Sequence, residues 1–210
     1  MLQIARVCIS MFVGLLSMSS TASELRTVPP SIEEVVELMS EHRMQAGMYR
    51  QEKTISGLSQ TLQSSGQYVI DADAGIVWGQ EQPFEDLLVV KGGQLFNLSD
   101  GVLVAQDVPI NIVSLMTDVF SGLMSADTVN LERQFSLEYL PEGQSTEYWT
   151  VTLSPSSAPL NNVFELITIS GQGGKLKQII LLERSGDRTE MTLTPLIETQ
   201  ASNIAHWLRG

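Results

Sequence analysis

Short apolar segments separated by tight-turn signals run through most of this chain, and this pattern constrains the fold more than any other feature. Turn residues occur as DADAG at 71–75, GG at 92–93, SDG at 99–101, GQGGK at 171–175 and SGD at 185–187. Such Asp-Gly and Gly-Gly pairs favour the tight turns of β-hairpins. The sequence therefore predicts successive antiparallel hairpins, which form a meander.

The segments between the turns have strand length and are rich in β-branched and aromatic residues. Roughly ten strands are expected, at the spacing typical of a barrel or sandwich. They are Gln60 to Ile70, Ile76 to Trp78, Phe84 to Val90, Gln94 to Leu98, Val102 to Gln106, Phe135 to Leu140, Trp149 to Ser154, Val163 to Ile169, Leu176 to Leu182 and Thr189 to Thr194.

Helical patterns occur at two places. Ser31 and Glu34 match a capping box, and Ile32, Val35, Val36 and Met39 then lie on one helical face, with Gly47 as the expected helix end. Apolar residues from Pro109 to Met124 recur at helical spacing, and Asp127 is expected to cap one further turn through Leu131. The tail from Ile204 fits either a short strand or a short helix.

The N-terminus has the features of an export signal. Arg6 provides a positive start, Val7 to Leu16 form an apolar run, and Ser20 and Ala22 suit a signal-peptidase site. We expect residues 1–22 to be removed and residues 23–210 to form one domain. The single cysteine, Cys8, lies in the removed segment, so the mature chain is expected to have neither thiol nor disulfide. This predicts a soluble, exported protein.

Charge and residue types argue against several function classes. The net charge of −12 disfavours nucleic acid and anionic membrane surfaces as partners. The two histidines, His42 and His206, do not have metal-ligand spacing, and no nucleophile motif is present, so no enzyme is predicted. Asp71 and Asp73 fit either a shared cation or Asx-turn hydrogen bonds.

The order of motifs resembles that of the LolA-like family of periplasmic lipoprotein carriers. The first motifs are the aromatic-x-Gln strand that starts at Tyr49, the Ser-Gly-x-aromatic strand that ends at Tyr68, and Trp78 followed by the loop with Pro83. The later ones are GLMSADTVNLERQF at 122–135, WTVTLSP at 149–155 and the hairpins of 174–194. The resemblance covers about residues 31 to 195.

The resemblance implies a half-barrel: a large curved antiparallel sheet covered by a helical lid, with an apolar interior that holds an acyl chain. It implies no catalytic residue, metal or cofactor. Strands that are apolar on both faces fit such a cavity but also fit an ordinary sandwich core, and the methionines fit either an adaptable lining or plain packing. The expected cavity residues are Trp78, Phe84, Leu88, Val90, Met116, Phe120, Met124, Trp149, Val151, Phe164, Ile167, Ile180 and Leu182.

One departure from the family concerns an Arg-Pro pair before the Trp, whose Arg holds the lid shut in LolA. Here the stretch is Val69 to Ala72, and Asp71 stands at the latch position. The leading hypothesis is a soluble, monomeric periplasmic carrier that takes an acylated cargo from an inner-membrane transporter to an outer-membrane acceptor. The cargo is a lipoprotein or another lipid, such as a glycolipid, an aryl-polyene lipid or a fatty-acyl product. The alternative hypothesis is a regulatory module that binds an envelope protein.

Overall fold

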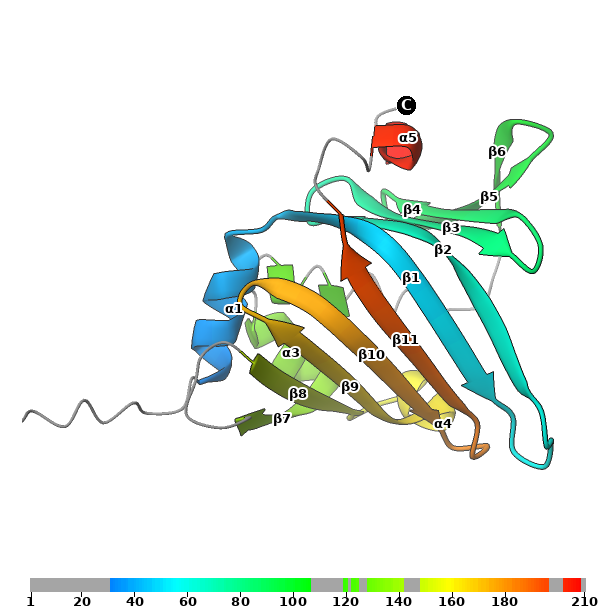
Figure 1. Cartoon of the computed structure of the whole chain (residues 1–210). Coiled ribbons are helices and arrows are strands. Elements are labelled where there is room, and N and C mark those ends of the chain that lie inside the picture. Colours follow the sequence, from blue (N-terminus) through cyan, green and yellow to red (C-terminus); the bar gives the residue numbers. More distant parts are fainter. Residues whose placement is uncertain are drawn as a thin grey trace, which may run out of the picture.

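The computed structural model describes residues 31–106, 119–120, 122–124, 128–141, 148–196 and 202–208. These residues form one antiparallel sheet of eleven strands with helices packed against it (Figure 1). The strands are β1 (Met44–Thr54), β2 (Thr61–Asp71), β3 (Gly75–Gln82), β4 (Asp86–Lys91), β5 (Gln94–Ser99), β6 (Val102–Ala105), β7 (Phe135–Pro141), β8 (Tyr148–Pro155), β9 (Phe164–Gln172), β10 (Lys175–Glu183) and β11 (Arg188–Pro195).

The sheet is open, with β6 and β7 at its two edges. Its strand order is β6-β5-β4-β3-β2-β1-β11-β10-β9-β8-β7, so the first and last strands are neighbours in the middle. In this pair Tyr49 lies opposite Leu193, and on its other side Tyr49 lies opposite Gly66 of β2. Figure 1 shows the sheet curving around the helices. The expected fold class, a half-barrel sheet with a helical cover, is confirmed.

The helices of the covered face begin with α1 (Ile32–Ser40). Its predicted capping box is present, because Ser31 accepts from the Glu34 amide and Glu34 accepts from the Ser31 amide. Val35, Val36 and Met39 are buried, as the apolar spacing predicted. Residues 119–120 and 122–124 are helical, and α3 (Thr128–Gln134) and α4 (Leu160–Val163) follow. The rest of the predicted helix Pro109–Met124, and the cap at Asp127, lie outside the described residues.

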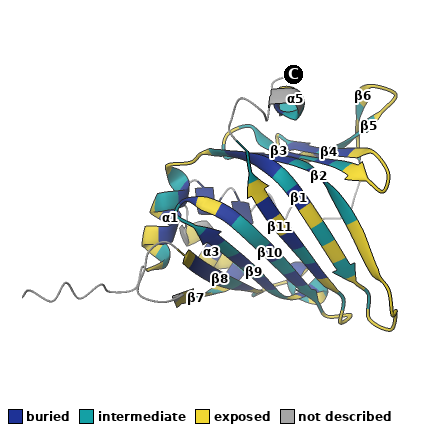
Figure 2. Ribbon diagram, in the orientation of Figure 1, coloured by how far each residue is buried: buried dark blue, intermediate teal, exposed yellow. Residues whose placement is uncertain are grey.

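The two faces of the sheet bury different apolar clusters. Figure 2 shows the buried residues along the strands. We call the face that carries Tyr49, Tyr68 and Ile167 the inner face. Its cluster includes the buried residues of α1, of the helical residues 119–120 and 122–124, and of α3 and α4. The outer face carries Val69, Val77 and Val89, which pack beneath the C-terminal helices α5 (Ser202–Ala205) and η2 (His206–Leu208). The tail is therefore helical, which settles the choice that its sequence left open.

A buried amide side chain joins the middle of the sheet to a hairpin turn. Gln45 of β1 is 6% exposed, and its Nε2 donates to the Gly174 carbonyl at 2.9 Å. Its Oε1 accepts from the Leu176 amide at 3.0 Å. The turn, which spans the GQGGK sequence, is a β9–β10 hairpin as predicted.

The prediction that Gly47 ends the first helix is wrong. The helix ends at Ser40, with Glu41 as its C-cap, and Gly47 lies inside β1. A Cβ at Gly47 would lie 2.3 Å from the Thr194 carbonyl oxygen and 2.9 Å from the Tyr68 ring. Only glycine fits at this position, because any Cβ would overlap the neighbouring strand backbone and the aromatic ring. Glycine inside a strand often marks such a close contact.

Candidate lipid-binding face

The inner face brings together most of the residues that the sequence predicted as a cavity lining. Trp149, Val151, Phe164 and Ile167 are each 2% exposed or less. They come from β8 and β9, whose register pairs Val151 with Ile169 and Leu153 with Ile167. Alternation along β8 directs Trp149 and Val151 to the same side of the sheet. In β9 an irregularity in the pairing with β10, between Leu166 and Phe164, brings Phe164 to the side of Ile167.

The other half of the inner face is formed by β2, β3 and β4. Trp78 lies opposite Leu88 on one side and opposite Tyr68 on the other. Trp78 and Leu88 are half-buried and pack against the inner cluster, and Val90 belongs to it at 7% exposure. The apolar lining therefore extends from β2 to β4 as well as from β7 to β9.

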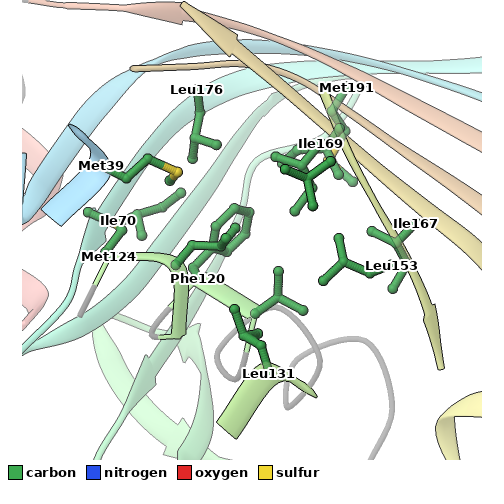
Figure 3. Packing of buried hydrophobic residues seen from close by; sticks show 14 of the residues in the cluster. Met39, Ile70, Phe120, Met124, Leu131, Leu153, Ile167, Ile169, Leu176 and Met191 are labelled. Atoms are coloured by element: carbon green, nitrogen blue, oxygen red, sulfur yellow. The ribbon is translucent and has the colours of Figure 1, made fainter. Parts of the chain in front are cut away.

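The helical residues of the cover fill the inner face with side chains. Phe120 is 1% exposed and Met124 is fully buried. Figure 3 shows both of them in the cluster between Ile70 of β2 and Leu131 of α3, with Met39 and Leu176 beyond. An acyl chain that entered this space would have to displace side chains of the cover.

Three aromatic rings gather on the inner face, and two of them were not among the predicted site residues. The ring centroid of Trp78 lies 4.3 Å from that of Tyr49 and 5.9 Å from that of Tyr68. Burial raises the pKa of Tyr49 and of Tyr68 to about 12. The Tyr68 hydroxyl is buried and has no hydrogen-bond partner among the described residues. The strand pattern contained the signal, because Tyr49 and Tyr68 are the aromatic positions of the two family-like strands.

Three predicted lining residues do not contribute as expected. Phe84 is 77% exposed in the connection between β3 and β4. Ile180 and Leu182 are half-buried on the outer face, because Ile179 and Leu181 of the same strand belong to the inner cluster. Met116 lies outside the described residues. The placement of the first three corrects the prediction: a strand that is apolar on both faces does not reveal which set points inward.

A recess of about 240 Å³ opens at the end of the inner face, between the β2–β3 and β4–β5 turns. Ile70, Ile76, Val90 and Phe120 form its apolar part. Asp71, Asp73 and Lys91 lie at its polar part. Phe120 therefore contributes to the packed interior and also borders a space that extends to the rim.

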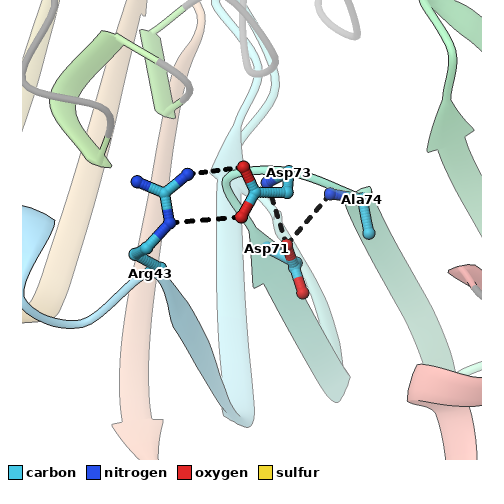
Figure 4. Close-up of polar contacts among 4 residues, drawn as sticks. All are labelled: Arg43, Asp71, Asp73 and Ala74. Atoms are coloured by element: carbon cyan, nitrogen blue, oxygen red, sulfur yellow. Dashed lines mark hydrogen bonds and ion pairs between the residues drawn. The ribbon is translucent and has the colours of Figure 1, made fainter.

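The polar side of this recess is organised by an aspartate turn and an arginine (Figure 4). Asp71 Oδ1 accepts from the amides of Asp73 and Ala74, each at 2.9 Å. This confirms the Asx-turn interpretation. Within the described part of the chain no three acidic, histidine or cysteine side chains come together as a metal site.

Arg43, which precedes β1, connects this turn to the start of the sheet. Its Nε lies 3.1 Å from Asp73 Oδ2 and its Nη2 lies 2.5 Å from Asp73 Oδ1. Its hydrogen bond lowers the pKa of Asp73, and the same contact raises the pKa of Arg43. The two side chains are 52% and 71% exposed, so an ion pair of this kind stabilises weakly. Among the described residues, the Arg43 side chain pairs with this turn of the sheet and with no helix of the cover.

The two histidines lie in separate elements. His42 follows α1 beside Gly174, and the ring centroid of His206 lies 4.6 Å from that of Trp207 in η2. Among the helices that the structure describes, none is both long and apolar enough to cross a membrane.

Comparison with known proteins rests on structure alone, because no protein-family model and no curated protein matches the chain. A LolA superfamily protein from Nitrosomonas europaea is similar at 11% identity and a TM-score of 0.39, over 82% of this chain and 97% of that one. The MucA/MucB complex of Pseudomonas aeruginosa contains a chain similar at 14% identity and a TM-score of 0.43, over 81% of this chain and 60% of that one. LprF from Mycobacterium bovis is similar at 10% identity and a TM-score of 0.35, over 80% and 94% of the two chains.

Proposed function

We propose that this protein is a non-enzymatic carrier that holds the acyl chain of a lipidated cargo between the inner face of its sheet and the helical cover. The observation that carries the proposal is the construction of this interior. The strands close the interior on one side, and helical side chains close it on the other. The described helical side chains are 3% exposed or less: Val119, Phe120, Leu123 and Met124. These side chains occupy apolar space that an acyl chain would fill equally well.

The energetics favour such an exchange. Transfer of an acyl chain from water gains about 0.8 kcal/mol per CH₂, which offsets the displacement of side chains from the interior. Met124 is flexible and polarisable, which suits a lining that adapts to different chains. The recess bordered by Phe120 provides a place where the chain would begin to enter.

The finer parts of the proposal concern compartment and partners. The export signal expected in residues 1–22 would place the mature protein in the periplasm as a soluble monomer. There it would receive a lipoprotein or related lipid from an inner-membrane transporter and pass it to an outer-membrane acceptor. Such a transfer requires no covalent chemistry, only a higher affinity of the acceptor for the cargo.

The direct test is uptake of a dansyl-labelled fatty acid, followed by its fluorescence. Leu88 is half-buried on the inner face of β4, and Ile180 is half-buried on the outer face of β10, so Leu88→Asp and Ile180→Asp add the same charge at matched depth on opposite faces. We expect Leu88→Asp to weaken uptake at least about tenfold, because a carboxylate in an apolar lining is costly, and Ile180→Asp to leave it unchanged.

Circular dichroism must show that both variants remain folded. If the folded wild-type protein takes up no acyl probe, or if the two substitutions weaken uptake equally, the carrier proposal is wrong. The alternative hypothesis, a regulatory module that binds an envelope protein, requires a docking surface outside the inner face.

A further inference from the structure

A groove of about 410 Å³ lies on the outer face, between strands β3 to β5 and the C-terminal helices. Its volume falls within the usual range for ligand sites. Leu87 and Leu98 contribute apolar surface from the sheet, and Ile204 and Trp207 contribute it from the helices. The proposed acyl site uses the opposite side of the same strands, so this groove is a separate site.

The charged residues that line the groove are all acidic. Glu81, Glu85, Asp86 and Asp100 line it, and no lysine or arginine is among the described residues that do so. Glu81 accepts from Gln67 at 2.7 Å, and Asp86 accepts from its neighbour's amide and from Asn97. These partners are neutral, and none of the four carboxylates forms an ion pair with a described residue.

The arrangement of the carboxylates indicates what kind of cation fits. They are contributed by β3, the β3–β4 connection, the start of β4 and the β5–β6 turn. They do not cluster as a metal site within the described residues. Separated carboxylates around apolar surface suit several cationic groups on one chain with apolar side chains between them.

We propose that this groove docks a basic, amphipathic segment of a protein partner. Lysine or arginine side chains of the segment pair with Glu81, Glu85 and Asp100. An apolar side chain between them packs on Leu87, Leu98 and Trp207. The net charge of −12 steers such a segment toward the protein. The docked partner and the acyl cargo bind at the same time, because they occupy opposite faces.

The test uses the full chain and a fluorescein-labelled peptide in which lysines alternate with leucine and phenylalanine, followed by fluorescence anisotropy. The test variant is Glu85→Gln with Asp100→Asn, since both side chains are exposed in the groove. The matched control is Glu132→Gln with Glu165→Gln, which removes the same charge from exposed positions outside the groove. We expect the groove variant to bind the peptide about three- to tenfold more weakly, and the control variant to bind as wild type does.

Three further measurements separate binding in the groove from binding elsewhere on the protein. A peptide of lysine alternating with serine should bind several-fold more weakly, and saturation with the dansyl fatty acid should leave peptide binding unchanged. Equal binding by the two double variants, or equal binding of the serine peptide, would mean that only the overall charge matters and would overturn the proposal. Displacement by lysine amide at a comparable concentration would assign the groove to small cations, and displacement by the fatty acid would place the peptide on the inner face; either result would also overturn it.

Discussion

The substitution Phe120→Ala tests whether the Phe120 ring competes with an acyl cargo or only fills the core. Phe120 is 1% exposed, and removal of a buried phenylalanine side chain costs about 3–5 kcal/mol of unfolding free energy. We expect the low end, about 3 kcal/mol, because Phe120 borders the recess of about 240 Å³, where the vacated space is continuous with an existing opening. For a domain of this size the loss corresponds to a decrease of about 6–12 °C in Tm.

The same vacancy should favour an acyl ligand. The chain of a fatty acid would occupy space that the ring no longer fills, so the variant should bind it more tightly than wild type does. A ligand at about one hundred times its Kd stabilises the folded state by about 2.7 kcal/mol. Thermal unfolding with and without fatty acid should therefore show a larger ligand-induced rise of Tm in Phe120→Ala than in wild type.

Phe164→Ala is the matched control. Phe164 is fully buried on the same face but does not line the recess. It should lose about 3–5 kcal/mol without any gain in ligand response. If fatty acid raises the Tm of the wild type and of both variants by the same amount, Phe120 does not compete with the acyl chain and the proposed exchange is refuted.

Three other predictions test separate features. Gly47→Ala should lower the unfolding free energy by about 2 kcal/mol or more in a urea titration, because its Cβ would lie 2.3 Å from the Thr194 carbonyl oxygen. Arg43→Gln should raise the pKa of Asp73 in an NMR titration; because the folded-state pKa is lowered, the pair stabilises above the unfolded pKa of Asp73 and its contribution disappears as pH falls through the folded value. Because residue 71 is an aspartate and not the latch arginine of the LolA-like family, backbone amides of 119–124 should exchange hydrogen readily in the empty protein and become protected when fatty acid binds. Strong protection that does not depend on the ligand would reveal another latch.

The hairpin pattern predicted ten of the eleven strands, because turn chemistry and strand alternation are local properties. The remaining strand, β1, was indicated only by the resemblance, as the strand that starts at Tyr49. The pairs Asp100-Gly101 and Gly92-Gly93 lie in turns with positive φ, where few other residues are stable. The capping box at Ser31 was equally local. These features depend on residues that are close in sequence, and the structure confirms them.

The parts that could not be predicted depend on contacts between distant segments. Ile180 and Leu182 have the same residue types as Ile179 and Leu181, and only the pairing of Ile179 with Met191 and Ile169 decides which pair faces inward. Gly47 resembled a helix end until the approach of Thr194 and Tyr68 was known. The outer-face groove was also not predictable, since Trp207 reaches strands that are far from it in sequence.

The pairing of β1 with β11 has a consequence for how the chain folds. The strands β1 to β6 and β7 to β11 each pair with neighbours in sequence, but the seam between β1 and β11, where Tyr49 lies opposite Leu193, can close only after nearly the whole chain is available. Contacts of such long range slow folding, because the loop-closure entropy is lost before the contact forms. Until then β1 exposes a long unpaired edge, which is open to pairing with other chains. The seam therefore delays completion of the sheet, and it gives a folding chain a longer period in which a chaperone would be useful.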